Sequence, residues 1–345
     1  MIKKIKVRLA AVAREAGVSV ATVDRVIHGR PGVKAHTAEH ILAVIAGMEN
    51  NKHRNSPRTA TRQADYYFDI ILPVGTNAFF NRLEEEIREY ANRPANRGIS
   101  IRIHRIKGFD PDVLAEKIDL VSHQTDGIAV VAIESPKVRE AVNRAVQKEI
   151  PVVTLVSDLS SSRRMGYVGL DNRSAGRTAG YLMGRFLTDT TGTVFMLAGS
   201  PMLRDHEERE MGFRRVLGER FVNLKIVSYL EDKDDAETAY KQVKKIIGEY
   251  PDLVGIYDIG AGTEGIAQAL LETKRDKDIV FIGHELNRYS REFLIDGVMD
   301  AVIDQVPRKQ ARTVIDLLEG FASGENGVYD SESAPIAVYF SENLP

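Results

Sequence analysis

The chain has 345 residues, with 47 Lys and Arg, 49 Asp and Glu, and no cysteine. This length exceeds that of one typical domain and suits a small head followed by two lobes. The absence of cysteine excludes a disulfide framework, and no apolar run approaches the roughly 20 residues that span a membrane. We therefore expect a cytoplasmic protein with no membrane partner.

The charges are distributed unevenly along the chain. Residues 1–63 hold twelve Lys and Arg against four Asp and Glu, a net charge of +8. The remaining residues hold 35 basic against 45 acidic side chains, a net charge of −10. A basic segment on an acidic body is typical of a nucleic-acid-binding domain joined to a second functional part.

The segment 9–37 predicts two helices joined by a tight turn. Ala13 and Gly17, four residues apart, permit close packing where the first helix ends, and Ser19 is positioned to cap the second. The inner face of the second helix carries Val18, Val23, Val26 and Ile27, and its outer face carries Val20, Ala21, Thr22, Asp24, Arg25 and His28. A helical hairpin that never contacts DNA is the alternative. The basic charge of the segment favours DNA binding.

The run A-R-E-A-G-V-S-x-x-T-V-x-R-V at 13–26 resembles the head of the lactose-repressor family of bacterial transcription regulators. The resemblance implies that the second helix lies in the major groove, where Arg25 reads a base edge. Guanine is the natural target, because its O6 and N7 match the guanidinium fork. The other DNA-binding candidates are Arg8, Ser19, Val20, Ala21, Thr22, His28, Lys34 and Thr37. Val20 and Ala21 offer only apolar contact, so the family's operator sequence does not carry over.

A second departure from the family lies in the linker, residues 51–65. Relatives place a short hinge helix here, with a leucine that wedges into the minor groove, whereas this chain has Pro57 and, near the wedge position, Thr59. Proline inside a helix removes a hydrogen bond and clashes with the preceding turn. The hinge either starts at Pro57 or stays extended and binds phosphates through Arg54, Arg58 and Arg62. A plain flexible linker is the other interpretation.

From residue 65 onward, short apolar runs alternate with amphipathic segments. Strands are expected at 66–74, 99–106, 128–133, 151–156, 193–199, 224–230, 253–259 and 279–283, with helices such as 81–92, 139–148, 176–186 and 236–250. Val- and Ile-rich runs separated by helices predict parallel sheets covered on both faces, and so many strands predict two lobes.

This part of the chain resembles the sugar-binding type of periplasmic receptor. The predicted fold class is therefore α/β: an all-α helix-turn-helix head followed by a two-lobed periplasmic-binding-protein type I fold with two parallel-sheet lobes. The expected parts are the head (1–50), the linker (51–65) and an effector-binding and dimerisation domain (66–345). Lobe one is expected to take 66–169 and 306–330, and lobe two 170–303 and 331–345.

Ligands of open α/β sheets bind beyond the carboxyl ends of the strands. The candidate effector-binding residues at those ends are Asn77, Phe79, Phe80, Asp158, Arg209, Asp258, Glu285 and Gln305. Arg209 resembles the family's effector-binding arginine. Individually these residues also read as helix caps or surface charges. Together they predict a pocket for a sugar, polyol or sugar acid, in which polar groups bind hydroxyls and flat rings cover the C–H face.

The segment GAGTEG at Gly260–Gly265 is the strongest competing signal. It fits G-x-G-x-x-G between a strand and a helix, and Glu285 lies 20 residues beyond it, as in dinucleotide-binding sites. Only 60 residues follow Glu285, too few for a conventional dinucleotide domain, and glycines at this turn also serve close packing. The run DKDDAE at 232–237 indicates a solvated helix start rather than a calcium loop. The histidine spacing, without cysteine, predicts no zinc site.

These observations predict a DNA-binding transcriptional regulator, acting as a repressor, that is not an enzyme and needs no cofactor or metal. It is expected to bind a pseudopalindromic double-stranded operator as a homodimer, under the control of a small effector between the lobes. A dinucleotide-binding enzyme or redox sensor that uses Gly260–Gly265 is the alternative. An exported solute receptor is a third possibility, which the basic head disfavours.

Overall fold

The computed structural model describes two units of the chain. The described residues are 9–28, 30–34, 36–38, 40–42, 44, 65–74, 77–96, 98–159, 161–199, 202–232, 234–324 and 334–345. One unit comprises residues 1–65 with 319–328, and the other comprises 66–318 with 329–345. The hinge prediction at Pro57 and the DNA-binding prediction for Arg8 both lie outside the described residues.

The head contains the two predicted helices, α1 (Leu9–Glu15) and α2 (Val20–Ile27). Its small core is formed by Val12, Ala13, Ala16, Val23 and Ile41, with Val18, Val26 and Ile27 packed against it. The turn passes through Gly17 at φ +66°, a left-handed conformation that glycine adopts without steric cost. Ser19 Oγ accepts a hydrogen bond from the Thr22 amide at 3.2 Å, which confirms the predicted cap of α2.

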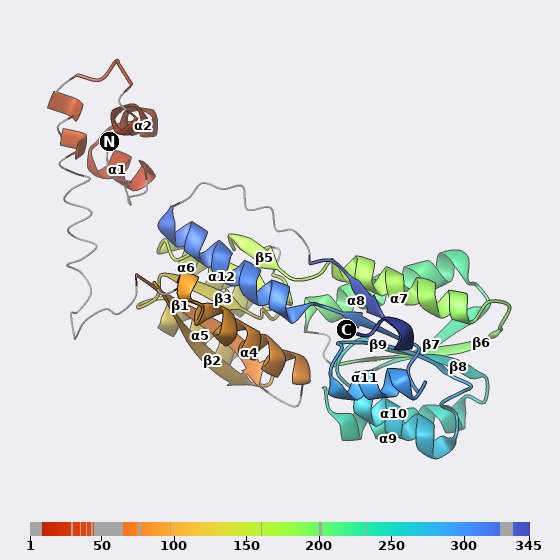
Figure 1. Ribbon diagram of the computed structural model, residues 1–345. Coiled ribbons are helices and arrows are strands. Elements are labelled where there is room, and N and C mark those ends of the chain that lie inside the picture. The colour runs from red at the N-terminus through yellow and green to blue at the C-terminus, as the bar shows by residue number, and fades with distance from the viewer. Residues whose placement is uncertain are drawn as a thin grey trace. The chain divides into compact units, whose positions relative to one another are not determined.

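The first lobe is built on a five-stranded parallel sheet in the order β2-β1-β3-β4-β5. Figure 1 labels β1, β2, β3 and β5 of this sheet. Its strands are β1 (Tyr66–Val74), β2 (Ile99–Lys107), β3 (Gly127–Val130), β4 (Val152–Leu155) and β5 (Gly166–Val168). The helices α5 (Pro111–Val121) and α6 (Pro136–Gln147) share one apolar core with the sheet. The helices α4 (Ala78–Ala91) and α12 (Pro307–Ser323) are joined by a 2.7 Å hydrogen bond from Tyr90 Oη to Asp316 Oδ1. A short 3-10 turn, η1 (Pro94–Asn96), precedes β2.

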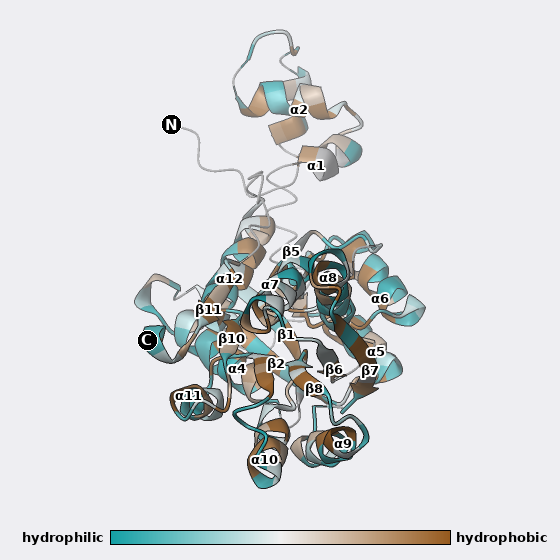
Figure 2. Ribbon diagram, turned by 90° about the vertical axis from the view of Figure 1, so that its right-hand side faces the viewer, coloured by the Kyte–Doolittle hydropathy of each residue, from teal (hydrophilic) through white to brown (hydrophobic). Residues whose placement is uncertain are grey.

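The second lobe is built on a six-stranded sheet in the order β11-β10-β9-β8-β6-β7. Its strands are β6 (Gly192–Ala198), β7 (Leu224–Glu231), β8 (Leu253–Asp258), β9 (Val280–His284), β10 (Ala301–Asp304) and β11 (Ala337–Tyr339). Among the described strand pairs of this sheet, only β10–β11 is antiparallel. One apolar cluster joins the sheet to α7 (Asn172–Phe186) and α8 (Arg204–Arg220), and a second joins it to α9 (Ala236–Glu249), α10 (Thr263–Thr273) and α11 (Arg288–Ile295). The strand β8 is brown in Figure 2, as expected of a strand covered on both faces. The last turn is η2 (Ser341–Asn343).

All eight predicted strands and the four predicted helices are present, and the α/β fold class with a helical head is confirmed. Three short strands, β5, β10 and β11, were not predicted. The chain passes from the first sheet to the second between β5 and α7, and returns between β10 and α12. The residue limits given above for the linker and the two lobes stay a prediction. Within the described ranges, no helix combines the length and apolar character needed to cross a membrane.

Candidate functional site

A cavity lies between the two lobes, at the carboxyl ends of both sheets. We call it the inter-lobe cavity. The first lobe contributes Asn77, Phe79, Phe80, Val131, Val156 and Ser157, and the second contributes Leu203, Asp205, His206, Arg209, Asp234, Gly260, Glu285 and Gln305. Parallel strands bring their carboxyl ends to one edge of each sheet, and this is why residues far apart in the sequence meet here.

Arg209 is held in place on two sides and leaves one donor group unpaired. It lies on α8 with 2% of its surface exposed. Nε donates to Oδ1 of Asn172 and Nη1 to the carbonyl of Ile259, both at 2.9 Å. Nη2 lies 3.6 Å from Oδ2 of Asp205 and makes no hydrogen bond with any described residue. The guanidinium is therefore fixed, with a donor available at the cavity wall.

Glu285 and Gln305 form a second polar pair in this wall. Gln305 Nε2 donates to Oε1 of Glu285, whose main chain takes φ +71° just after β9. Burial, followed by the charge of Asp304, raises the pKa of Glu285 to about 8. Arg209, Gln305 and Arg82 act in the opposite direction on this pKa. At neutral pH the Glu285 carboxyl is therefore mostly protonated.

The first lobe contributes an amide and two aromatic rings. Oδ1 of Asn77 accepts from the Phe79 amide at 3.0 Å and so caps α4, while Nδ2 donates across the cavity to Oδ2 of Asp234 at 3.1 Å. The rings of Phe79 and Phe80 meet edge to face, with centroids 5.4 Å apart. Rings beside hydrogen-bonding groups are the usual composition of a small-molecule site.

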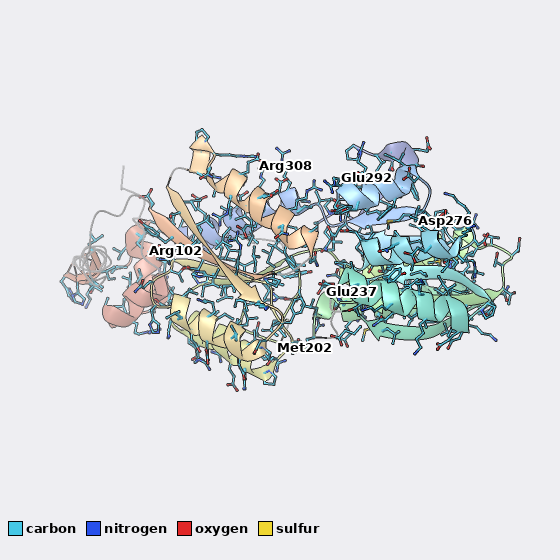
Figure 3. All side chains as sticks on the ribbon, turned by 90° about the horizontal axis from the view of Figure 1, so that it is seen from below. Arg102, Met202, Glu237, Asp276, Glu292 and Arg308 are labelled. Carbon is cyan, nitrogen blue, oxygen red and sulfur yellow. The ribbon has the colours of Figure 1, made fainter. Side chains whose placement is uncertain are left out.

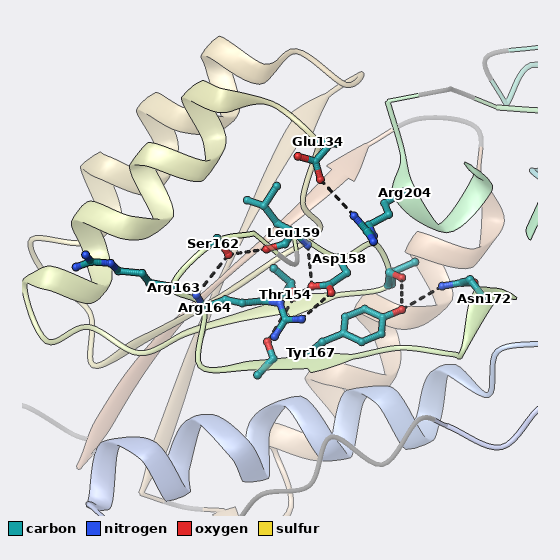
Figure 4. Close-up of polar contacts among 12 residues, drawn as sticks. Glu134, Thr154, Asp158, Leu159, Ser162, Arg163, Arg164, Tyr167, Asn172 and Arg204 are labelled. Carbon is teal, nitrogen blue, oxygen red and sulfur yellow. Dashed lines mark hydrogen bonds and ion pairs between the residues drawn. The ribbon is translucent and has the colours of Figure 1, made fainter. Parts of the chain in front are cut away.

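Six of the eight predicted effector-binding residues line this cavity: Asn77, Phe79, Phe80, Arg209, Glu285 and Gln305. Asp158 does not line it, because its carboxylate binds Arg164 Nη2 at 2.6 Å and Thr154 Oγ1 at 2.7 Å within the first lobe (Figure 4). Asp258 is also outside the lining, since it accepts from Thr263 Oγ1 at 2.7 Å and from the Gly260 amide at 3.1 Å.

The structure adds polar residues that the sequence prediction missed. Asp205 and His206 lie about one helical turn before Arg209 on α8, a spacing that places side chains on one helix face. Asp234 comes from the run 232–237, which was predicted to be solvated. That prediction is wrong for its acidic start, because Asp232 is fully buried and Asp234 is 5% exposed.

The glycine turn at Gly260–Gly265 is closely packed against acidic residues and backbone. The amide of Ala261 donates to Oδ1 of Asp234 at 3.1 Å. A side chain at Gly262 would meet Oδ2 of Asp232 at 2.3 Å, and one at Gly265 would meet the carbonyl of Ala236 at 1.9 Å. Carboxylates therefore occupy turn amides that a pyrophosphate would need. The dinucleotide alternative is not supported.

Three buried carboxyl groups lie together behind this turn, those of Asp232, Asp234 and Asp258. Burial, followed by the charges of Asp258 and Asp234, raises the pKa of Asp232 to about 8. Burial likewise raises the pKa of Asp258 to about 6. The cluster therefore retains a proton at neutral pH. Across the described part of the chain, no group of three or more His, Asp and Glu is arranged to hold a metal ion.

The predicted DNA-binding residues of the head fall into two groups, those with exposed side chains and those that make local hydrogen bonds. Arg25, Ala21, Lys34 and Val20 are exposed, with Val20 at 47%. The remaining described candidates make local contacts: Ser19 Oγ with Thr22 Oγ1 at 2.8 Å, His28 Nδ1 with the Asp24 carbonyl at 2.9 Å, and Thr37 Oγ1 with His36 Nε2 at 3.2 Å. An exposed guanidinium on α2 is free to approach a base edge. Contact of each of these residues with DNA stays a prediction.

A helix-turn-helix head and a two-lobed domain that encloses a polar cavity are the two parts that a ligand-responsive DNA-binding regulator requires. Comparison with family models agrees. Residues 8–50 match the bacterial regulatory proteins of the lacI family, and residues 68–326 match a periplasmic binding protein domain. The chain thus belongs to the proteins with a periplasmic binding protein domain, whose model matches more than half of it, and its head is a lacI-family domain.

Curated relatives include regulators and a transport protein. The HTH-type transcriptional regulator MalR of Clostridium butyricum is 25% identical over 91% of this chain and 93% of its own length. Catabolite control protein A of Staphylococcus epidermidis is 24% identical over 70% of this chain and 71% of its own. Ribose import binding protein RbsB of Bacillus subtilis is 24% identical over 78% of this chain and 86% of its own length. The chain therefore has the domain composition of a lacI-family transcriptional regulator.

Solved structures share the two-lobed fold. GanP, a glucose-galactose binding protein from Geobacillus stearothermophilus, aligns with a TM-score of 0.74 at 22% identity, covering 82% of this chain and all of that one. A solute binding protein from Burkholderia graminis, in complex with D-arabinose, aligns with a TM-score of 0.76 at 23% identity. The alignment covers 82% of this chain and 98% of that one. At this identity the likeness establishes the fold.

Proposed function

We propose that the chain binds a pseudopalindromic operator as a homodimer and senses a small sugar-like effector in the inter-lobe cavity. One observation carries this proposal: a single cavity is lined by α4 of the first lobe and by Arg209, Glu285 and Gln305 of the second. A ligand there would contact both lobes at once. It would therefore favour the closed arrangement over an open one, in which these contacts are lost.

Direct contacts between the lobes support a closing motion as the response. Arg82 Nη1 donates to the Leu286 carbonyl at 2.7 Å, and the Arg204 amide donates to Ser157 Oγ at 3.1 Å. These bonds join α4 to the loop before α11, and the end of β4 to the start of α8. An effector changes DNA binding only if it binds the open and closed states with different affinity.

On the DNA side, the proposal assigns base reading to α2. Arg25 would bind guanine, while Val20 and Ala21 would make apolar contact, such as with a thymine methyl group. The two-fold symmetry of a homodimer would be matched by an inverted repeat in the operator. This assignment is supported by the lacI match over 8–50 and by the exposure of these three side chains.

The test is selection of binding sites from random double-stranded DNA by the full chain, followed by measurement of the stoichiometry. We expect an inverted repeat bound by two protomers. A site without dyad symmetry, bound by one protomer, would contradict the dimer model. A thermal-shift screen of aldoses, polyols and sugar acids then tests the effector site, because a ligand that binds the native state raises the melting temperature.

A further inference from the structure

The side chain of Tyr167 lies where the chain passes from the first lobe to the second. Tyr167 belongs to β5, and its hydroxyl group meets Asn172 at the start of α7 (Figure 4). Nδ2 of Asn172 donates to Oη of Tyr167 at 3.1 Å. The same Oη donates its proton to the carbonyl oxygens of Val156, at 2.8 Å, and Leu170, at 3.0 Å. One hydroxyl group therefore contacts the residue after β4, the crossing between the lobes and the start of α7.

Asn172 extends the contact of Tyr167 to Arg209. It is 1% exposed, and its Oδ1 accepts from Nε of Arg209 at 2.9 Å. A side-chain amide donates at one end and accepts at the other. Because Oη of Tyr167 and the Leu170 carbonyl both accept from Nδ2, the amide presents Oδ1 to the guanidinium. A reversed amide would place its N–H groups against the Nε–H group of Arg209. Tyr167 therefore fixes the orientation in which Asn172 holds Arg209.

The second partner of the Tyr167 hydroxyl group is a residue with a strained backbone. Val156 lines the inter-lobe cavity and has φ +66°, a left-handed conformation that β-branched residues rarely adopt. Such a conformation persists only where surrounding contacts hold it. The Val156 amide donates to the Val168 carbonyl at 2.8 Å, and its carbonyl accepts from Tyr167. The hydroxyl group is therefore bonded to cavity residues of both lobes, directly to Val156 and through Asn172 to Arg209.

The crossing beside Tyr167 is closely packed. Leu170 forms a parallel bridge with Ala334, and the Ala334 amide donates to the Gly169 carbonyl at 2.9 Å. A side chain at Gly169 would lie 2.1 Å from Oη of Tyr167, so the tyrosine lies against the crossing only because this residue is glycine. Tyr167 and Asn172 lie on opposite sides of the crossing. A rotation of the lobes about it would therefore change the distance between them.

We propose that Tyr167 is a positioning residue for the effector response and acts through Asn172 on Arg209. This inference rests on the proposed effector site and adds the residue that connects this site to the lobe crossing. In the closed arrangement, the hydroxyl group holds the guanidinium at the cavity wall. In an open arrangement, the contact between Tyr167 and Asn172 is lost, and Arg209 loses its oriented partner. Effector affinity and lobe closure are therefore coupled through one hydroxyl group.

The first experiment needs no ligand. It uses NMR on the full chain with ¹⁵N-labelled arginine to measure how fast the Nε–H proton of Arg209 exchanges with water. The signal is assigned by its loss in Arg209→Lys. A buried, hydrogen-bonded proton exchanges slowly. Tyr167→Phe keeps the ring and removes only Oη, and we expect it to speed this exchange at least tenfold. Arg308, which is exposed on α12 and labelled in Figure 3, supplies a fast-exchanging reference.

The matched control is Tyr90→Phe. It also removes one tyrosine hydroxyl group, which donates to Asp316 at 2.7 Å within the first lobe. The exchange of the Arg209 proton in this variant should equal that of the wild type. A wild-type exchange rate in Tyr167→Phe would overturn the inference.

A rescue variant separates positioning from a general structural effect. Asn172→Asp carries oxygens at both ends of the side chain, so an acceptor faces Arg209 in either orientation. In this background, Tyr167→Phe should leave the exchange of the Arg209 proton within twofold of that in Asn172→Asp alone. An increase as large as that in the wild-type background would show that Tyr167 does not act by orienting residue 172, and would overturn the inference.

The second experiment connects this role to ligand binding. Calorimetry with D-ribose, D-arabinose and D-galactose identifies the sugar that the wild type binds most tightly, and this sugar is the probe. We expect Tyr167→Phe to weaken its binding at least threefold in the wild-type background and less than twofold in Arg209→Lys, which lacks the Nε–H group. Equal losses in the two backgrounds would overturn action through Arg209. If none of the three sugars binds the wild type, the proposed effector class is contradicted, while the proton exchange still decides the role of Tyr167.

Discussion

Asn77 and Asp234 connect the two lobes through a hydrogen bond of 3.1 Å, from Nδ2 of the first to Oδ2 of the second. The other oxygen of Asp234 accepts from Ala261 in the glycine turn, and the other end of Asn77 caps α4 at Phe79. The contact between Asn77 and Asp234 therefore links the start of α4, beside Phe79, to the glycine turn of the second lobe.

Replacing Asn77 with Asp should open the two lobes. The variant keeps a side-chain oxygen that caps α4, but it places a second carboxylate against Asp234, and like charges at this separation repel. We expect a larger radius of gyration by small-angle X-ray scattering without ligand, and three- to tenfold weaker effector binding. Asn77→Ser, which caps the helix without adding charge, is the control. Equal scattering from Asn77→Asp and the wild type would argue against this contact as a closing element.

Adding a methyl group in the glycine turn should destabilise the second lobe. In Gly265→Ala the new carbon would lie 1.9 Å from the Ala236 carbonyl, so backbone must shift. Such overpacking costs about 1–3 kcal/mol, which corresponds to a melting temperature lower by about 3–10 °C. Gly218→Ala is the matched control, because nothing lies within 4 Å of the added carbon on the exposed side of α8. That variant should be as stable as the wild type or slightly more stable, by up to about 1 kcal/mol. Similar melting temperatures for the two variants would refute the packing role.

Neutralising Asp232 should stabilise the protein at alkaline pH. Its pKa rises from an ordinary 3.8 to about 8 on folding, so the folded state keeps a proton that the unfolded chain loses between these values. The contribution of this group to the free energy of unfolding is complete below pH 4 and is lost as the pH rises to 8. Calorimetry should show Asp232→Asn melting several degrees above the wild type at pH 8.5, with little difference near pH 4.

The control for this prediction is Asp296→Asn at the exposed end of α11. Its melting temperature should differ from that of the wild type by the same small amount at every pH. A gap between Asp232→Asn and the wild type that does not grow with pH would show that the buried carboxyl is not protonated in the folded state.

The sequence predicts the long strands well, because Val- and Ile-rich runs mark them; a central strand such as β6 is buried along its whole length. It does not predict β5 and β10, whose apolar runs are short, or β11; the equally short β3 and β4 were predicted from the longer runs 128–133 and 151–156. Asp205 and Asp234 were missed for a different reason. Both lie in charged runs that resemble solvated helix starts, and only tertiary packing buries them.

A position at the end of a strand is not sufficient to identify the residues that line the inter-lobe cavity. Asp158 and Asp258 each follow a buried strand, where ligands of open α/β sheets are expected to bind. Their carboxylates nevertheless accept hydrogen bonds from nearby groups and do not line the cavity. Arg164 lies six residues beyond Asp158, and Thr263 lies five residues beyond Asp258. Whether a carboxylate at a strand end turns toward the ligand or back into its lobe depends on such neighbours, which the spacing of strands does not reveal.

Replacing Arg25 in the head should change sequence preference, not only affinity. Loss of one bidentate guanine contact costs about 1–3 kcal/mol and relaxes the preference at that base pair. Arg58→Ala, in the linker, should instead weaken binding to all sequences and flatten the salt dependence. Fluorescence anisotropy with operator and scrambled DNA at several salt concentrations separates the two effects. Equal loss of specificity in both variants would disagree with major-groove reading by Arg25.

The central claim is that a ligand in the inter-lobe cavity controls the DNA-binding head. The most direct measurement is the operator Kd by fluorescence anisotropy, with and without a saturating neutral sugar that calorimetry has shown to bind, in the wild type and in Arg209→Ala. We predict that the sugar changes the wild-type Kd at least fivefold, that Arg209→Ala loses this response at the same sugar concentration, and that the two proteins bind operator equally without sugar. A wild-type Kd that stays constant at saturation, or an Arg209→Ala variant that responds like the wild type, would contradict the account.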